Sequence, residues 1–221
     1  MSESAKQKWA VFISLLVIVA SCVWIYFSQF HSPKFNVALH KKIGQVMAEE
    51  TAKITGPKGG RISIITIEGK ECPELKMQLA SYEESLKKLG NFKFKEHLLE
   101  TKDQPKYGIG TGLSGRRFLR VAEKSKNAQV IVSFVGAPNV KDLSESELEK
   151  IKPISPVVAE VRSPDHLRKL FDKQLIAVAI VSRFEFPAPG PVEPKTPGDW
   201  FNKRYQIVTA TNAAQLPKSQ P

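Results

Sequence analysis

The sequence predicts an α/β fold, in which helices cover both faces of a mainly parallel sheet of about five or six strands in one three-layer domain. Two observations lead to this expectation. Short apolar runs rich in β-branched residues alternate along the chain with amphipathic helical segments, which is the pattern of βαβ units. A separate uncharged stretch, residues 9–30, is long enough to cross a bilayer as a helix. We therefore expect one transmembrane helix in front of a single α/β domain.

The N-terminal region is expected to be an anchor with short flanks. Residues 1–8 form a polar segment, residues 9–30 the transmembrane anchor and residues 31–36 a linker. A cleaved signal peptide is the main alternative, because Lys6 and Lys8 in front of the apolar run also suit an export signal.

Cys22 raises a second alternative for this region. Residues 19–22 read Val-Ala-Ser-Cys and resemble a lipobox, in which the cysteine would be lipid-modified. The apolar run continues beyond Cys22 through Trp24 and Phe27, however, where a processed protein normally turns polar. The length of the run therefore favours an uncleaved anchor. The other cysteine, Cys72, stands alone in the body, so we expect no disulfide within the domain.

The net charge is strongly positive, with 33 Lys and Arg against 22 Asp and Glu and a formal charge of +11. Such a charge can attract anionic lipid headgroups, acidic polymers or nucleic acid. No clustered basic patch is visible in the sequence, so a solvated basic surface is the simpler interpretation. The chain has no RNA-binding aromatic motif and no zinc-ligand spacing, and we expect neither a nucleic-acid partner nor a bound metal.

The predicted α/β domain spans residues 37–212. Its first half begins with a helix expected over residues 36–54. Residues 62–67 form a nearly continuous apolar run, as expected for a strand covered on both faces. The next helix begins at Pro73, carries leucines at helical spacing and stops at Gly90. Residues 92–99 alternate apolar and polar side chains, which predicts a strand near an edge of the sheet.

The second half continues the alternation. Ser144 and Glu147 form a capping box at the start of a short helix. The proline-rich residues 187–198 predict a stiff, extended loop, and residues 213–221 predict a flexible tail. The remaining expected elements are helices over residues 115–126 and after residue 163, and strands over residues 130–135, 157–161, 175–181 and 205–210.

The loop GIGTGLSGRR at residues 108–117 contains the pattern G-x-G-x-x-G and nearly spells a Walker A loop. A dinucleotide fingerprint needs its glycines directly after a buried strand, and here a polar insert separates them from the preceding strand. Arg116 stands where Walker A needs lysine, and Arg117 where it needs Ser or Thr. The G-x-S-x-G nucleophile elbow fails at Arg116 as well. We therefore expect no nucleotide cofactor, and the sequence offers no complete set of catalytic groups.

What remains in this loop is a basic start of a helix. Ser114 is a good N-cap residue, and the first-turn amides together with Arg116 and Arg117 would attract an anion. The simpler alternative is that Ser114 caps its own helix and the glycines only turn the chain.

Two stretches resemble type I periplasmic sugar-binding proteins. IGQVMAEETAKITGPKGGRISIITI, residues 43–67, is similar to a helix that ends in a glycine-rich turn and feeds a central strand in these proteins. GRRFLRVAEKSKNAQVIVSFVGAP, residues 115–138, is similar to the helix and strand that follow. The resemblance covers residues 43–209 and rests on the pattern of elements. It implies a flavodoxin-like lobe, an exported body and a non-enzymatic binding function.

The resemblance also implies where a ligand would bind. Such receptors close two lobes on a ligand, and this chain has residues for one lobe, which would leave an open half-site at the carboxyl ends of its strands. The residues expected to line this half-site are Gly69, Gly110, Gly112, Ser114, Arg116, Arg117 and Asn139.

Two functions stay open at this point. One is a binding or scaffold subunit of an envelope complex, anchored in a bacterial cytoplasmic membrane with its body on the periplasmic side. The other is a receptor for a sugar or small anion whose second lobe comes from a partner subunit or from a homo-oligomer.

Overall fold

The computed structural model describes residues 3–29, 35–67, 72–99, 113–140, 143–144, 146–147, 149, 156–161, 167–183 and 194–216. The chain divides into two compact units, Met1–Asn36 and Val37–Pro221.

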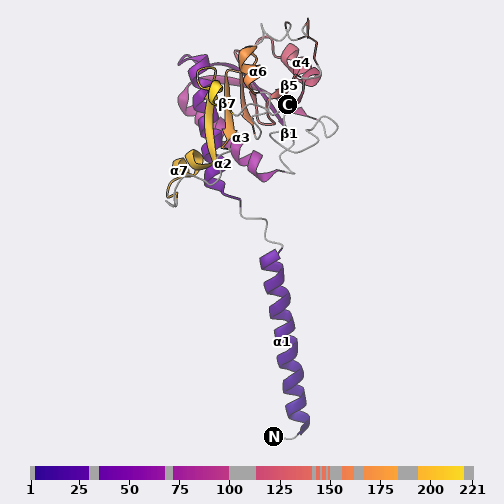
Figure 1. Ribbon diagram of the computed structural model, residues 1–221. Helices are drawn as coiled ribbons and strands as arrows, with labels where there is room; N and C mark the ends of the chain where they lie inside the picture. The colour runs from indigo at the N-terminus through magenta and orange to yellow at the C-terminus, as the bar shows by residue number, and fades with distance from the viewer. Residues whose placement is uncertain are drawn as a thin grey trace. The chain divides into compact units, whose positions relative to one another are not determined.

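The first unit contains helix α1 (Glu3–Gln29), labelled in Figure 1. Its stretch Gln7–Tyr26 has a mean hydropathy of 2.3 over 20 residues, and none of it is buried. By length and composition this helix is able to cross a membrane, and a signal sequence near an N-terminus has the same properties.

The second unit is built on a six-stranded sheet with the strand order β2-β1-β4-β6-β7-β8. All neighbouring strands are parallel except the last pair, in which β8 runs antiparallel to β7. The strands are β1 (Gly60–Ile67), β2 (Phe92–Leu99), β4 (Val130–Ser133), β6 (Val157–Val161), β7 (Val178–Ser182) and β8 (Tyr205–Thr209). The α/β class and the mainly parallel sheet of the sequence analysis are confirmed.

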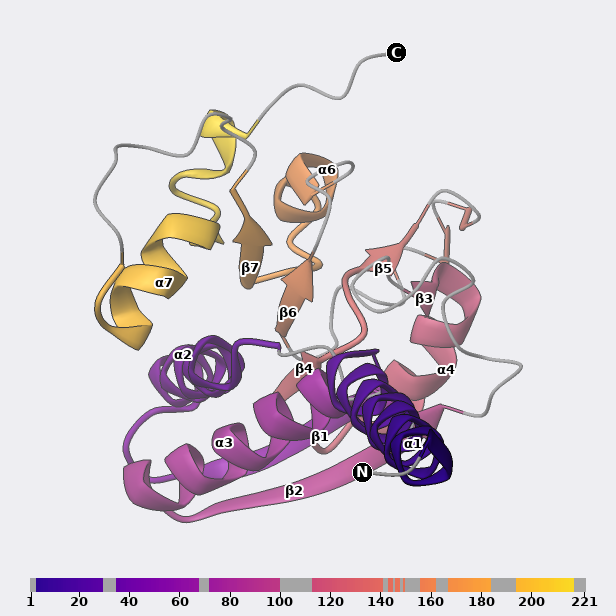
Figure 2. The same ribbon diagram turned by 90° about the horizontal axis from the view of Figure 1, so that it is seen from below.

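Helices cover both faces of this sheet. Figure 2 shows α2 (Val37–Thr55) and α3 (Pro73–Leu89) on one side, and α4 (Gly115–Lys124) and α6 (Leu167–Asp172) on the other. Helices α2 and α3 pack so closely that a Cβ at Gly44 would collide with the backbone oxygen of Gln78. The residues of the central strands β1, β4, β6 and β7 are almost all buried, and together with the apolar stripes of the helices they form one continuous core.

An aromatic pair stands at the centre of the core on the α3 side. The rings of Tyr82 and Phe134 meet edge to face with centroids 5.3 Å apart. The Tyr82 hydroxyl donates to Thr51 Oγ1 over 3.3 Å, so the one polar atom of this ring has a partner. Burial raises the pKa of Tyr82 far above its usual value.

The predicted edge position of residues 92–99 is confirmed, because β2 is the outermost parallel strand. The predicted strand 175–181 instead begins at Val178. Gln174, with φ of 58°, turns the chain there, and Leu175 and Ile176 are buried in the approach to the strand. Apolar burial alone therefore does not mark where this strand begins.

Two predictions for the C-terminal region are wrong. The predicted proline-rich loop 187–198 is not a loop at its C-terminal end, because helix α7 (Pro197–Arg204) begins within it. Thr196 and Asp199 form a capping box, and a proline at the first helical position suits this start. The predicted flexible tail begins too early, since Ala213 and Leu216 are buried in the core on either side of the short helix η2 (Ala213–Gln215).

Candidate functional site

The strand order of the sheet marks one crevice as a place for a ligand. The chain goes from β1 outward to β2 and then returns to the other side of β1 as β4, so the order reverses between β1 and β4. In open α/β sheets, ligands bind outside the carboxyl ends of the strands at such a switch point. The segment that leaves the carboxyl end of β4 is residues 134–140.

A small second sheet forms directly beyond this point. Strand β3 (Leu113–Ser114) pairs in parallel with strand β5 (Pro138–Asn139), and Ser114 is the register partner of Asn139. This pairing joins the start of α4 to the segment after β4. It sets Ser114 beside Asn139, and Arg116 and Arg117 follow in the first turn of α4. All four are residues that the sequence analysis predicted.

Two further contacts fix the shape of this region, and neither was foreseen from the sequence. Ser133, at the end of β4, donates from its hydroxyl to the backbone oxygen of Gly136 over 2.6 Å. A Cβ at Gly115 would lie 2.7 Å from the backbone oxygen of Asn139 and 2.5 Å from Leu143 Cγ. Gly115 is thus required by the close approach of α4 to β5, which explains one glycine of the loop without a bound nucleotide.

The orientation of α4 decides which of its side chains face outward. Phe118 and Ala122, four residues apart, are buried against the sheet. Arg116 is therefore exposed and Arg117 is half-buried. The positive end of the helix dipole lies at the same place as these guanidinium groups, so this corner has a positive potential.

The expectation that Ser114 caps α4 with its side chain is wrong. Ser114 occupies the N-cap position, but its side chain makes no capping hydrogen bond. Its φ and ψ of −59° and 145° follow from its pairing in β3. The side chain is exposed beside Asn139, which is also exposed.

The predicted residues Gly69, Gly110 and Gly112 lie outside the described residues. The four described ones offer a hydroxyl, an amide and two guanidinium groups, which suit a solute rich in hydroxyl or anionic oxygens. Among the described residues, no group of three or more His, Cys, Asp or Glu side chains is placed to hold a metal ion.

A serine and histidine pair elsewhere in the domain was not predicted. Ser125 Oγ lies 3.2 Å from His97 Nε2 and 2.6 Å from Ser63 Oγ. Ser125 also donates its hydroxyl proton to the backbone oxygen of Val121 over 2.7 Å. Because that proton is directed into α4 and Ser125 is 5% exposed, the pair links elements of the fold and does not form an activated nucleophile.

The fold is that of the sugar-binding proteins of ABC transporters, matched along about four fifths of this chain. One structure of this class is a solute-binding protein from Burkholderia graminis C4D1M in complex with D-arabinose, with a TM-score of 0.54, 21% identity, and coverage of 81% of this chain and 62% of that one. Another is a sugar-binding protein from Bacillus halodurans, with a TM-score of 0.52, 14% identity, and coverage of 80% and 64%.

The present chain thus spans less than two thirds of the length of either protein. No protein-family model matches the sequence, and no curated protein matches it. The similarity is one of fold.

Proposed function

We propose that this protein is a non-enzymatic, membrane-anchored binding component whose α/β lobe contributes one wall of a site for a small polar solute. The β3–β5 pairing is the observation that carries the proposal, because it sets Asn139, in the segment after β4, beside Ser114. Arg116 and Arg117 follow Ser114 in the first turn of α4 and would belong to the same wall. Gly69, Gly110 and Gly112 would complete the same wall.

The class of solute follows from the chemistry of this wall and from the fold. Hydroxyl, amide and guanidinium groups recognise sugar hydroxyls or a small anion. The fold is shared with proteins whose structures are described as sugar-binding or bound to D-arabinose, which favours a sugar.

A single wall buries too little of a small ligand for tight binding, since ligand sites usually enclose most of the ligand surface. We therefore place the opposite wall on a partner subunit or on a second copy of this chain. Helix α1 would keep the lobe at the membrane, with the lobe on the periplasmic side.

A thermal-shift screen of the full-length protein with pentoses, hexoses and small anions tests the solute site. A ligand present at about a hundred times its Kd is expected to raise the Tm by roughly 5–10 °C. The Arg116→Ala variant should lose this shift, whereas Arg120→Ala should keep it, because Arg120 is also exposed but lies one helical turn further along α4. A panel in which no compound moves the Tm counts against the solute site.

A scaffold role is the second candidate, favoured by the one-sided geometry of the wall. In that case Arg116 and Arg117 would contact carboxylates of a protein partner. Purification from mild detergent after cross-linking distinguishes the two functions. A stable partner that is lost in Arg116→Glu, together with a screen that yields no solute, supports the scaffold, and a lone monomer contradicts it.

A further inference from the structure

A second surface lies at the opposite end of the strands from the proposed solute site. It is a cleft at the amino ends of β1 and β2, closed on its third side by the turn that follows α4. Two adjoining cavities of about 210 and 270 Å³ make up this cleft, and both are lined by Arg61, Lys93 and Asn127. We call it the basic cleft.

Among the described residues, the charged side chains that line the basic cleft are all cationic, and no acidic residue lines either cavity. The cationic residues are Lys58, Arg61, Lys93, Lys95 and Lys124. Within the described part of the chain, none of them forms a salt bridge with a carboxylate; the salt bridges found there join Lys53 to Glu50 and Lys88 to Glu84. The cleft therefore concentrates positive charge that the fold does not neutralise locally.

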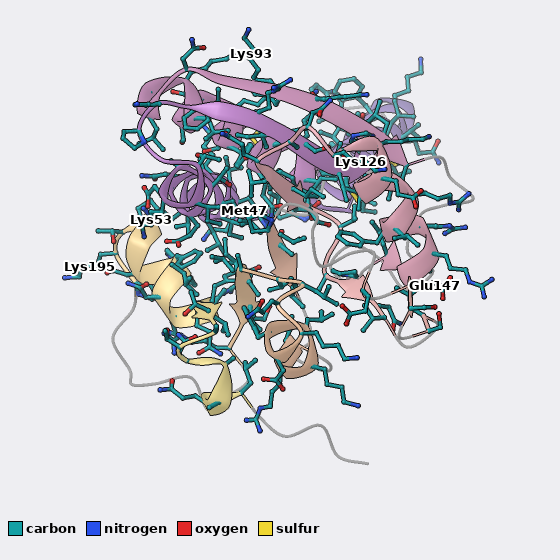
Figure 3. All side chains as sticks on the ribbon, turned by 90° about the horizontal axis from the view of Figure 1, so that it is seen from above. Met47, Lys53, Lys93, Lys126, Glu147 and Lys195 are labelled. Atoms are coloured by element: carbon teal, nitrogen blue, oxygen red, sulfur yellow. The ribbon has the colours of Figure 1, made fainter. Side chains whose placement is uncertain are left out.

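The sheet and the length of α4 explain why this surface is open. Side chains alternate along β2, so Lys93 and Lys95 point to the face that α4 covers, as His97 does through its contact with Ser125. Helix α4 has ten residues, about 15 Å of rise, whereas the eight residues of β2 extend over about 26 Å. The amino half of the strand remains uncovered. Figure 3 labels Lys93 at this outer edge of the sheet.

The polar side chains at the floor of the cleft, Ser63 and Ser125, already have hydrogen-bond partners within the fold. Ser125 gives its proton to the backbone oxygen of Val121, so Ser63 must donate to Ser125 over 2.6 Å. His97 Nε2, at 3.2 Å, can then meet Ser125 Oγ only as a donor, which places the proton of the neutral ring on Nε2. The floor thus holds β1, β2 and α4 in position.

The charged groups on the walls are hydrogen-bond donors. Arg61, Lys93, Lys95 and Lys124 have donors and no side-chain acceptor, and the Asn127 amide adds two donors and one acceptor oxygen. Donor-rich cationic walls favour phosphate oxygens, which accept charge-assisted hydrogen bonds from several directions. Each cavity has room for such a group, since a water molecule takes about 30 Å³ in the liquid.

We infer that the basic cleft binds a ligand with two or more linked phosphate groups. The two cavities share Arg61 and Lys93, which would lie between successive phosphates, while Lys58 and Lys124 lie at the outer ends. This site is separate from the solute site at the carboxyl ends of the strands, and it does not depend on the proposed function. The cationic residues of the basic cleft also account for part of the net charge of +11.

Titration of the full-length protein in neutral detergent with inorganic tripolyphosphate, followed by calorimetry, tests this inference. We expect saturable binding of one tripolyphosphate per chain, and weaker binding of inorganic phosphate. The double variant Lys93→Ala/Lys95→Ala should bind tripolyphosphate about tenfold more weakly, the loss expected for two exposed charge contacts. Both lysines are exposed, so the variant should fold, and circular dichroism checks this.

The matched control is Lys76→Ala/Lys169→Ala, which removes the same charge from exposed positions on α3 and α6. Its affinity for tripolyphosphate should equal that of the wild type. Equal losses in both double variants would show a diffuse effect of net charge and would overturn the inference. The absence of saturable binding to the wild type at low salt would overturn it as well.

The phosphate groups belong either to a soluble molecule or to lipid headgroups. A competition experiment with an anionic lipid distinguishes these two kinds of ligand. Tripolyphosphate binding is repeated in micelles that contain cardiolipin, whose headgroup carries two linked phosphate groups. A loss of affinity for the wild type that Lys93→Ala/Lys95→Ala does not share identifies lipid phosphate as the occupant. Unchanged affinity identifies a soluble phosphorylated ligand.

Discussion

At Gly115, helix α4 packs tightly against the segment that follows β4. A methyl group at position 115 would lie only 2.7 Å from the backbone oxygen of Asn139, which is closer than van der Waals contact allows. Because this oxygen belongs to the backbone, it cannot move aside as the end of a side chain can. This contact holds Ser114 and Asn139 together at the proposed solute site.

Gly115→Ala is therefore expected to destabilise the domain by about 1–3 kcal/mol, as overpacking does. Chemical denaturation measures this loss. Gly198→Ala is the control, because its Cβ would meet only Thr196 Oγ1 at 3.7 Å and should leave stability unchanged or raise it slightly. A Gly115→Ala protein as stable as the control would contradict the assigned packing role.

The sequence of the loop 108–117 argues against a Walker A site, because Arg116 and Arg117 occupy positions that this motif gives to other residues. It could not show that Gly115 faces Asn139, since the two are far apart in the chain and meet only through β3–β5 pairing. The same pairing turned Ser114 away from its expected capping bond.

At the scale of elements, His97 connects the edge strand to the end of α4. Burial, followed by the positive charges of Lys95 and Lys124, lowers the pKa of His97 from its ordinary value of 6.5. The unfolded chain therefore binds a proton at this residue more readily than the folded one, and stability must decrease as the pH falls below about 6.5.

The His97→Gln variant removes this dependence while keeping a hydrogen-bonding group near Ser125. Urea denaturation at about pH 7.5 and about pH 5.5 should show a smaller loss of stability on acidification for the variant than for the wild type. Parallel losses in the two proteins would mean that other groups account for the acid sensitivity.

Helices and strands with a strong hydrophobic periodicity were predicted correctly from the sequence. Helices whose start depends on a local capping signal were not always predicted. The leucine pattern of α3 and the apolar runs of β1 and β4 needed no tertiary information. Helix α7 was missed, because the surrounding prolines and a glycine predicted a loop. Thr196 and Asp199 formed a visible cap signal that should have outweighed them.

At the scale of the whole molecule, the core belongs entirely to the second unit. The buried apolar residues of the described chain run from Leu39 to Leu216, and none comes from the first unit. A chain that begins at Val37 should therefore fold alone, remain in solution without detergent, and keep the Tm of the full-length protein within about 2 °C.

Scanning calorimetry of the two proteins makes this comparison, with the full-length protein in neutral detergent. A shortened chain that aggregates or melts well below the full-length protein would show that residues 1–36 cover apolar surface of the lobe. Retained stability would leave α1 free for a role at the membrane.

The sequence alone determined the α/β class, the main run of elements and the apolar N-terminal helix, because periodicity and apolar length are local properties. Only the tertiary structure decided which residues meet. Strand order placed residues 134–140 at the switch point, and β3–β5 pairing set Ser114 beside Asn139. The same sheet aligned Arg61 with Lys93 as register partners and so assembled the basic cleft. Residues scattered over the chain form a site only when the strands that carry them become neighbours.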